Sequence, residues 1–247
     1  MQQFSILFHF GLKCRSKDFF VLFYNIVFPL VMILALGYLT SPSYGTAFLS
    51  YHYYTIVIIP FSALTGISTV SYAAQDEKVF RTAYRYLAAP INKHEIVLSK
   101  FASSAIVLSF CNYSTLLIAM VMFGFHFNFY ILLVILLLTS ETIAVTGIGL
   151  YLGLSWKNLD ALRNYLNVPI VVFGFLGGVF FPVHSSQPVL NAMITLSPFT
   201  WINRGIASCL YDNQTDTIII VSGALLVCGM VMVLLTICCF KKEVFLT

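Results

Sequence analysis

Long apolar blocks separated by short polar segments dominate the pattern along this chain. A helix needs about 20 apolar residues to cross the hydrocarbon core of a membrane. The pattern contains six blocks of about that length and therefore predicts six membrane-spanning helices. We place these spans at 19–39, 52–74, 101–124, 130–154, 165–183 and 217–240.

The composition agrees with this reading of the pattern. Of the 247 residues, 60% are hydrophobic and 9% are charged, and the mean hydropathy is +0.92. Soluble domains carry roughly 25% charged residues. The sequence therefore predicts an all-α membrane protein with one domain over 1–247. Its formal net charge of +4 is no sign of a nucleic-acid partner, because in such a chain it has to be read loop by loop.

Twelve of the thirteen basic residues fall on one side of the predicted topology. Segments 1–18, 75–100, 155–164 and 241–247 hold three, five, two and two of the thirteen Lys and Arg residues, and Arg204 is the remaining one. Basic residues are biased to the cytoplasmic side of a membrane. We therefore expect a multi-pass plasma-membrane protein surrounded by lipid, with both termini in the cytoplasm.

The segment 75–100 is a conspicuous polar run between two predicted spans. Helical periodicity gives it a basic side with Lys78, Arg81 and Arg85 and an apolar side with Phe80, Tyr84 and Leu87. Pro90 should end this helix. Asn92 and Glu95 resemble a capping box that starts a new helix near Lys93. The charges either set the topology alone, or belong to a surface helix on which a cytoplasmic partner acts.

Two stretches carry a resemblance to a known family. The first, "YLAAPINKHEIVLSK" with the preceding Glu77-Lys78 and Arg81-Thr82, resembles the first cytoplasmic loop of type-2 ATP-binding-cassette (ABC) exporter permeases. It departs from the family pattern at Arg81, where the family has glycine. The second, "GGVFFPVHSSQPVLNAMITLSPFTWINRGI", resembles the segment that follows the fifth span of that family.

The resemblance implies a permease subunit that pairs with a second, identical or different permease and with a separate cytoplasmic ABC ATPase. ATP and Mg would be bound by that ATPase, because this chain has no G-x-x-x-x-G-K-[ST] phosphate-binding motif. The implied function is export of a hydrophobic or amphipathic drug or antimicrobial peptide across a bacterial plasma membrane. The alternatives are polysaccharide, teichoic acid or lipid-linked export by the same family, and a stand-alone channel or secondary transporter.

The resemblance also assigns a role to the segment 75–100, the coupling helix that contacts the ATPase. The residues it singles out are Lys78, Phe80, Arg81, Tyr84, Arg85, Leu87, Pro90, Lys93 and Glu95. The chain itself is predicted to be a transport subunit and not an enzyme. An intramembrane protease would need convergent catalytic groups, and Glu141 has no histidine in register.

Polar residues inside the apolar blocks are candidates for a substrate path: Thr65, Ser68, Asn112, Tyr113 and Glu141. An ionisable residue at mid-membrane indicates function by default. The alternatives are hydrogen bonds between helices and, for Glu141, a protonated carboxyl bound to a neighbouring hydroxyl. Gly149 and Gly153 permit close helix packing, which we expect within the chain. No Cys or His pair has metal-ligand spacing, and no metal site is predicted.

Two segments outside the long apolar blocks, one on each side of the membrane, predict further short helices. Residues 1–18 read as an amphipathic helix at the membrane interface. Residues 184–216 read as two short re-entrant helices interrupted at Pro198, or alternatively as an ordinary surface hairpin. The residues expected to form an outer cap on the exit are Phe181, Pro182, Pro198, Trp201 and Arg204.

Overall fold

The computed structural model describes residues 2–43, 47–75, 91–124, 130–156, 159–180 and 188–240, and every regular element within them is helical. The elements are α1 (Gln2–Ser16), α2 (Phe19–Leu22), the π-helical turn η1 (Phe23–Val27), α3 (Phe28–Thr40), the 3-10 turn η2 (Ser41–Ser43), α4 (Ala47–Ala74), α7 (Lys93–Phe123), α8 (Ile131–Ser155), α9 (Leu159–Leu176), α10 (Pro188–Leu196), α11 (Pro198–Tyr211) and α12 (Asp216–Cys239). The predicted all-α fold is confirmed.

Within the described residues, five helical stretches are long and apolar enough to cross a membrane. They are Phe19–Thr40, Ser50–Ala74, Lys93–Phe123, Ile131–Ser155 and Asp216–Cys239. The predicted span 165–183 coincides with α9, whose apolar part Asn164–Leu176 is shorter than the others. This helix ends early because Gly177 and Gly178 follow it, and Gly178 has a φ of 78°, a conformation that favours glycine.

The first span is irregular near its start, where η1 interrupts the α-helix. Pro29 follows η1 and has no backbone N–H to donate to the carbonyl of Asn25, four residues earlier. The Thr115 hydroxyl of α7 donates to that carbonyl instead, at 3.2 Å. The carbonyl left without an intrahelical partner in the first span thus connects that span to α7, because a buried carbonyl needs a hydrogen-bond donor.

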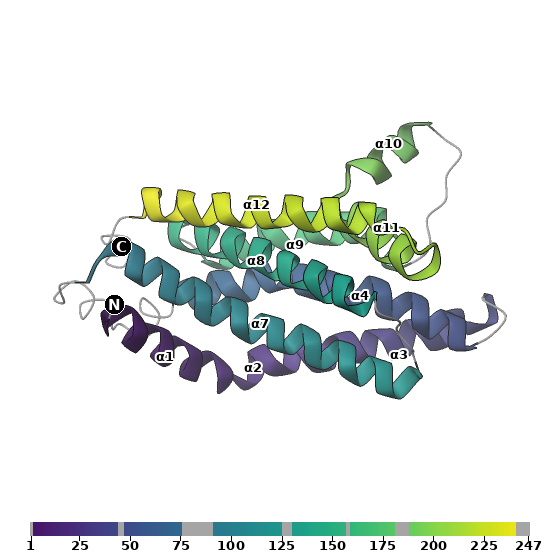
Figure 1. Ribbon diagram of the computed structural model, residues 1–247, viewed down its shortest axis with the longest axis horizontal. Helices are drawn as coiled ribbons and strands as arrows, with labels where there is room; N and C mark the ends of the chain where they lie inside the picture. Colours follow the sequence, from purple (N-terminus) through teal and green to yellow (C-terminus); the bar gives the residue numbers. More distant parts are fainter. Residues whose placement is uncertain are drawn as a thin grey trace.

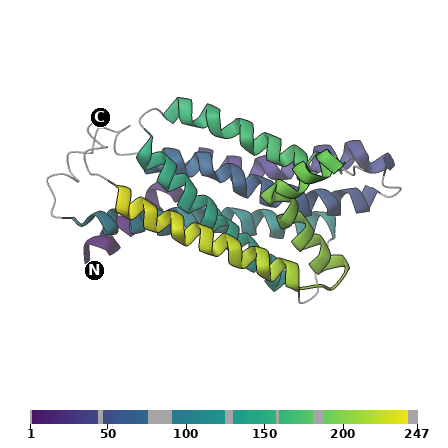
Figure 2. The same cartoon turned by 90° about the horizontal axis from the view of Figure 1, so that it is seen from above.

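Glycines allow α8 to lie close to both α4 and α12 in the middle of the bundle (Figures 1 and 2). A Cβ atom on Gly153 would lie 2.6 Å from the Ser71 carbonyl oxygen of α4. A Cβ atom on Gly147 would lie 2.7 Å from the Gly229 carbonyl oxygen of α12. The expected role of the Gly149 and Gly153 pair in packing within the chain is confirmed, since Gly149 faces Val70 of α4.

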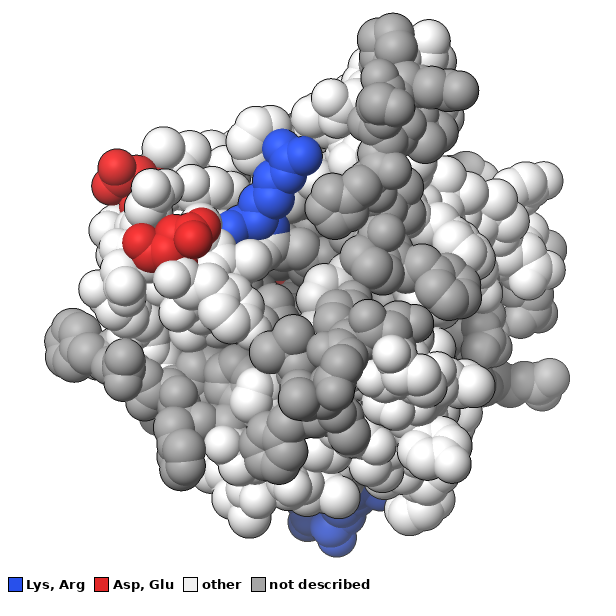
Figure 3. All heavy atoms as spheres, turned by 90° about the vertical axis from the view of Figure 1, so that its right-hand side faces the viewer, with Lys and Arg blue, Asp and Glu red and all other residues white. Residues whose placement is uncertain are grey.

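The bundle has two different ends. The described chain begins and ends at one of them, where α4 also ends and α7 begins (Figure 1). The short helices α10 and α11 lie at the other end, and α10 projects from the bundle there (Figure 1). That end is viewed in Figure 3, where most of the described residues carry no charge. The two short helices separated at Pro198 are as predicted, and their re-entrant placement in the outer leaflet stays a prediction.

Large apolar side chains cover the outside of the long helices. Phe19 and Val121 each leave 77% of their surface exposed, and Leu117 leaves 63%. Extended apolar surfaces are rare on soluble monomers. A bundle with this surface is stable when lipid chains surround it.

Candidate functional site

Two basic side chains from different helices cap the C-terminal end of α4. Lys100 of α7 donates through Nζ to the carbonyl oxygens of Ala74, at 3.0 Å, and Ala73, at 3.4 Å. Arg15 donates to the Ala73 carbonyl at 3.5 Å and to the Lys100 carbonyl at 3.1 Å. The last carbonyls of a helix lack partners within it and carry the negative end of its dipole, so cations stabilise them. Both side chains are buried, and they join α1, α4 and α7 at one point.

Gln75, the residue after α4, extends this connection to α8. Its Nε2 group donates to the carbonyl oxygens of Gly153 and, at 2.6 Å, of Trp156. Both carbonyls lie at the end of α8 (Ile131–Ser155). We call Arg15, Gln75 and Lys100 with their carbonyl partners the basal clamp. It fixes the chain directly before residues 76–90.

The segment after residues 76–90 is fixed as the sequence predicts. The Asn92 backbone N–H donates to Glu95 Oε2 at 3.3 Å, which completes the capping box at the start of α7. Ile96 and Val97 are fully buried in the core immediately afterwards. Lys93 is exposed at the first position of the helix. The other predicted coupling residues, Lys78, Phe80, Arg81, Tyr84, Arg85, Leu87 and Pro90, lie outside the described residues.

A buried polar layer crosses the middle of the bundle. Gly66 of α4 faces Leu108 of α7 and Val145 of α8, at 3.3 and 3.4 Å from an ideal Cβ atom. One helical turn further toward the α10–α11 end lie Ser62, Asn112 and Glu141, because α4 and α8 run opposite to α7 (Figure 1). Their exposed fractions are 3%, 2% and 1%.

This layer contains polar atoms without hydrogen-bond partners. Within the described part of the chain, neither carboxyl oxygen of Glu141 nor the Nδ2 of Asn112 is bonded. The hydroxyl of Thr142, next to Glu141, pairs with Ser109 at 3.1 Å instead. The expected bond from a neighbouring hydroxyl to Glu141 is therefore wrong for the described residues. Unbonded polar groups are costly in a low-dielectric interior, and an intramembrane carboxyl that persists there indicates a function.

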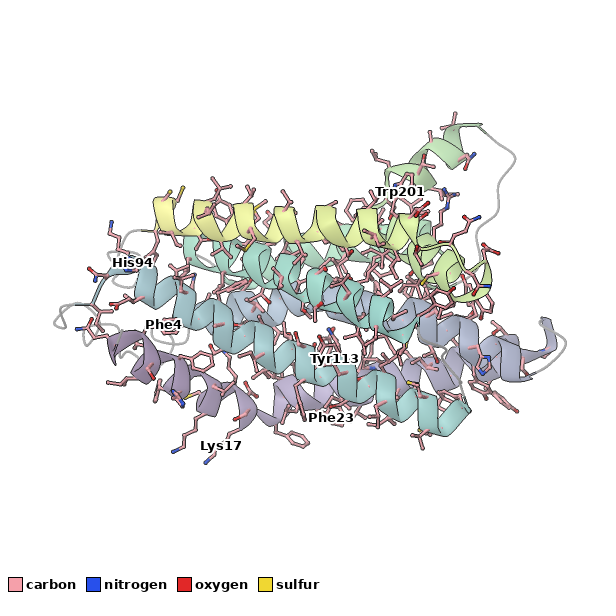
Figure 4. All side chains as sticks on the ribbon, in the orientation of Figure 1. Phe4, Lys17, Phe23, His94, Tyr113 and Trp201 are labelled. Carbon is pink, nitrogen blue, oxygen red and sulfur yellow. The ribbon has the colours of Figure 1, made fainter. Side chains whose placement is uncertain are left out.

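In the described part of the chain, the predicted substrate-path residues do not all line the cavity that Ser68 lines. The Thr65 hydroxyl donates to the Ser62 carbonyl at 2.7 Å, and Tyr113 lies close to the side chains of Ser109 and Thr139. Figure 4 shows Tyr113 among the side chains inside the bundle. Ser68 instead lines a cavity nearer the basal clamp.

The outer helices are fastened to the bundle through side chains and carbonyls. Trp201 of α11 donates to the Thr195 carbonyl at 2.9 Å, which closes the end of α10 (Figure 4). Asn203 donates to the Gly177 carbonyl at 2.9 Å, and Tyr53 of α4 donates to the Gly178 carbonyl at 2.8 Å. Of the predicted cap residues, Pro198 starts α11 and Arg204 is exposed, whereas Phe181 and Pro182 lie outside the described residues.

Comparison with known proteins gives one match. The family described as ABC-2 type transporter matches residues 2–211, which extend from α1 through α11. A search of curated proteins finds no match. The family match agrees with the resemblance carried by the two stretches of the sequence.

Proposed function

We propose, on the premise that this chain belongs to the ABC-2 type transporter family, that it is the permease subunit of an exporter in a bacterial plasma membrane. Its substrate is a hydrophobic or amphipathic drug or antimicrobial peptide. A separate ABC ATPase supplies the energy by hydrolysing ATP with Mg, and a second permease completes the pore. Polysaccharide, teichoic acid or lipid-linked export is the alternative.

The basal clamp is the observation that carries this proposal. The described chain stops after Gln75 and resumes just before the capping box of Asn92 and Glu95, so both residues flanking 76–90 are held in place. Arg15 and Lys100 join both of these flanks to α1 through carbonyls of α4 and α7. Hydrogen bonds to charged groups contribute about 1.5–3 kcal/mol each. A displacement of the coupling segment by an ATPase would therefore move α1, α4, α7 and α8 together.

The charge distribution supports the proposed orientation. Lys93 and Lys100 lie at the end of the bundle where the described chain begins and ends, and Arg15 is joined to Lys100 there. Arg204 lies on α11 at the opposite end. Basic residues favour the cytoplasmic side. The end with the basal clamp is then the cytoplasmic end, where an ATPase can reach it.

The exposed face of α9 supports a second permease subunit. Tyr165 and Val168 leave 70% and 65% of their surfaces exposed, and Asn164 and Asn167 are exposed on the same short helix. Amide side chains are unfavourable against lipid chains. A neighbouring subunit would cover them and bury the apolar residues between them.

Co-purification with a separate ABC ATPase from the same organism tests the proposal. The pair should be retained together in detergent, and ATP hydrolysis in proteoliposomes should rise when substrates of the proposed class are added. Lys100→Met should leave the pair assembled but abolish this stimulation, because the flanks of the coupling segment would separate. Lys13→Met, which removes an exposed cation of α1, is the matched control. Failure to bind the ATPase would disprove the proposal.

A further inference from the structure

A cavity of about 690 Å³ lies between the end of α1, the start of the first span, α4, α7 and α9. We call it the α1–α4 cavity. Its size is within the range of small-molecule sites, about 300–1,000 Å³. The described residues that line it include Ser68 of the predicted substrate path but neither Asn112 nor Glu141. It is therefore distinct from the buried polar layer.

The depth of this cavity is set by the helices around it. Phe20 and Val21, which line it, belong to the first turn of the candidate span Phe19–Thr40. Tyr72 and Ala73, on its other side, belong to the last turn of α4. The cavity thus lies where lipid headgroups meet the hydrocarbon core, at the end of the bundle that holds the basal clamp.

One side of the α1–α4 cavity carries positive charge. The Arg15 side chain is 8% exposed, and its guanidinium stays charged at any working pH. Lys17 lines the cavity as well and is directed away from the bundle in Figure 4. The Asp18 carboxylate accepts hydrogen bonds from the backbone N–H groups of Phe20, at 3.0 Å, and Val21, at 3.4 Å, so the positive end of α2 offsets its charge.

The same cavity offers a buried hydroxyl. Ser68 Oγ is inaccessible to solvent and has no hydrogen-bond partner within the described residues. A hydroxyl can donate to one acceptor oxygen, and rotation of the Ser68 side chain to another staggered rotamer would turn this group toward the cavity. The positive charge and this donor together favour an anionic headgroup with oxygen acceptors, such as a phosphate ester.

The other side of the cavity is apolar and opens toward lipid. Val107 and Leu108 form buried walls. Phe20 lines the cavity and also leaves 61% of its surface exposed, and Phe23 and Val31 extend the exposed apolar surface along the first span. Acyl chains can follow this surface away from the cavity while a headgroup remains inside it.

We infer that the α1–α4 cavity binds one anionic phospholipid of the adjacent leaflet. Its phosphate lies by Arg15 and Ser68, and its chains run along the exposed face of the first span. Basic pockets between membrane helices on the cytoplasmic side recognise such headgroups. Because Arg15 also belongs to the basal clamp, the bound lipid stabilises the connection between α1 and α4. The inference requires a membrane protein but not the proposed substrate or ATPase.

Native mass spectrometry of the purified chain tests lipid retention directly. We expect one phosphatidylglycerol to remain bound per chain, at least about tenfold more tightly than phosphatidylcholine, since the charged headgroup makes the difference. Inorganic phosphate at millimolar concentration should not displace it. Equal retention of the two lipids, or displacement by inorganic phosphate, would overturn the assignment of an anionic lipid.

Two variants and a thiol probe locate the lipid. Arg15→Gln removes the buried charge, and Ser68→Leu fills the cavity without touching the basal clamp, so both should weaken retention by about tenfold or more. Lys13→Gln should not change it. In a chain with Cys238→Ser and Cys239→Ser, phosphatidylglycerol should slow maleimide labelling of Cys14, an exposed residue that lines the cavity. Unchanged retention in Ser68→Leu, or unchanged labelling of Cys14, would show that the lipid binds elsewhere.

Discussion

Replacing Glu141 with leucine should stabilise the fold and at the same time impair transport. Glu141 is 1% exposed, and neither of its carboxyl oxygens is bonded within the described residues. A buried polar group without a partner costs about 1–3 kcal/mol. Leucine has a similar size and no polar atom, so Glu141→Leu should raise the free energy of unfolding by about 2 kcal/mol.

The neighbouring residue provides a matched control of opposite sign. Thr142 is equally buried, but its hydroxyl pairs with Ser109 at 3.1 Å and donates to the Leu138 carbonyl at 2.9 Å. Thr142→Val keeps the shape and removes these bonds, which should cost about 1 kcal/mol. Removal of the polar group should therefore raise the free energy of unfolding at position 141 and lower it at position 142.

Thermal unfolding of the purified variants in one detergent measures both effects, as the temperature at which half of the protein remains monodisperse. A gain of this size raises the midpoint by several degrees in chains of this length. In proteoliposomes with the ATPase, Glu141→Leu should keep basal ATP hydrolysis and lose its stimulation by substrate. A lower midpoint for Glu141→Leu than for the wild type would refute the reasoning, because the carboxyl would then have a stabilising partner.

Three further predictions follow from packing, charge and the coupling segment. Gly153→Val should abolish folded protein on size-exclusion chromatography, because its Cβ would lie 2.6 Å from the Ser71 carbonyl oxygen. Gly223→Ala should be tolerated, because none of the described residues lies within 4 Å of the Cβ that it adds. A thiol introduced by Ser186→Cys should react with impermeant maleimide from outside the cell, and labelling from the cytoplasm alone would reverse the topology. The Leu87→Asp variant should insert normally but bind the ATPase roughly 30- to 150-fold more weakly, because loss of one buried leucine costs about 2–3 kcal/mol. Leu87→Met, which keeps the apolar side chain, is the control. If Leu87→Asp binds the ATPase as the wild type does, this segment is not part of the coupling surface.

Much of the helical framework follows from local patterns in the sequence. Apolar length predicts where the long helices lie, and the capping box of Asn92 and Glu95 predicts where α7 begins. Pro198 marks the boundary between α10 and α11. These signals act over a few residues along the chain, so they can be read without knowledge of the tertiary structure. Gly177 and Gly178 set the end of α9 just as locally. The residues that follow them are apolar, so hydropathy alone predicted a span that continues to 183.

The partners of the polar side chains are decided by the tertiary structure. In the sequence, Arg15 and Lys100 are two basic residues among those that set topology. In the fold they are buried and bind carbonyls of α4, and Arg15 is 58 residues away from one of its acceptors. Likewise, Ser62, Asn112 and Glu141 lie at one depth in the bundle only because three helices pack in a particular register. A sequence shows which groups can donate or accept a hydrogen bond. Whether such a group is buried, and which partner it finds, depends on helix packing, because the close contacts at glycines decide which distant segments come together.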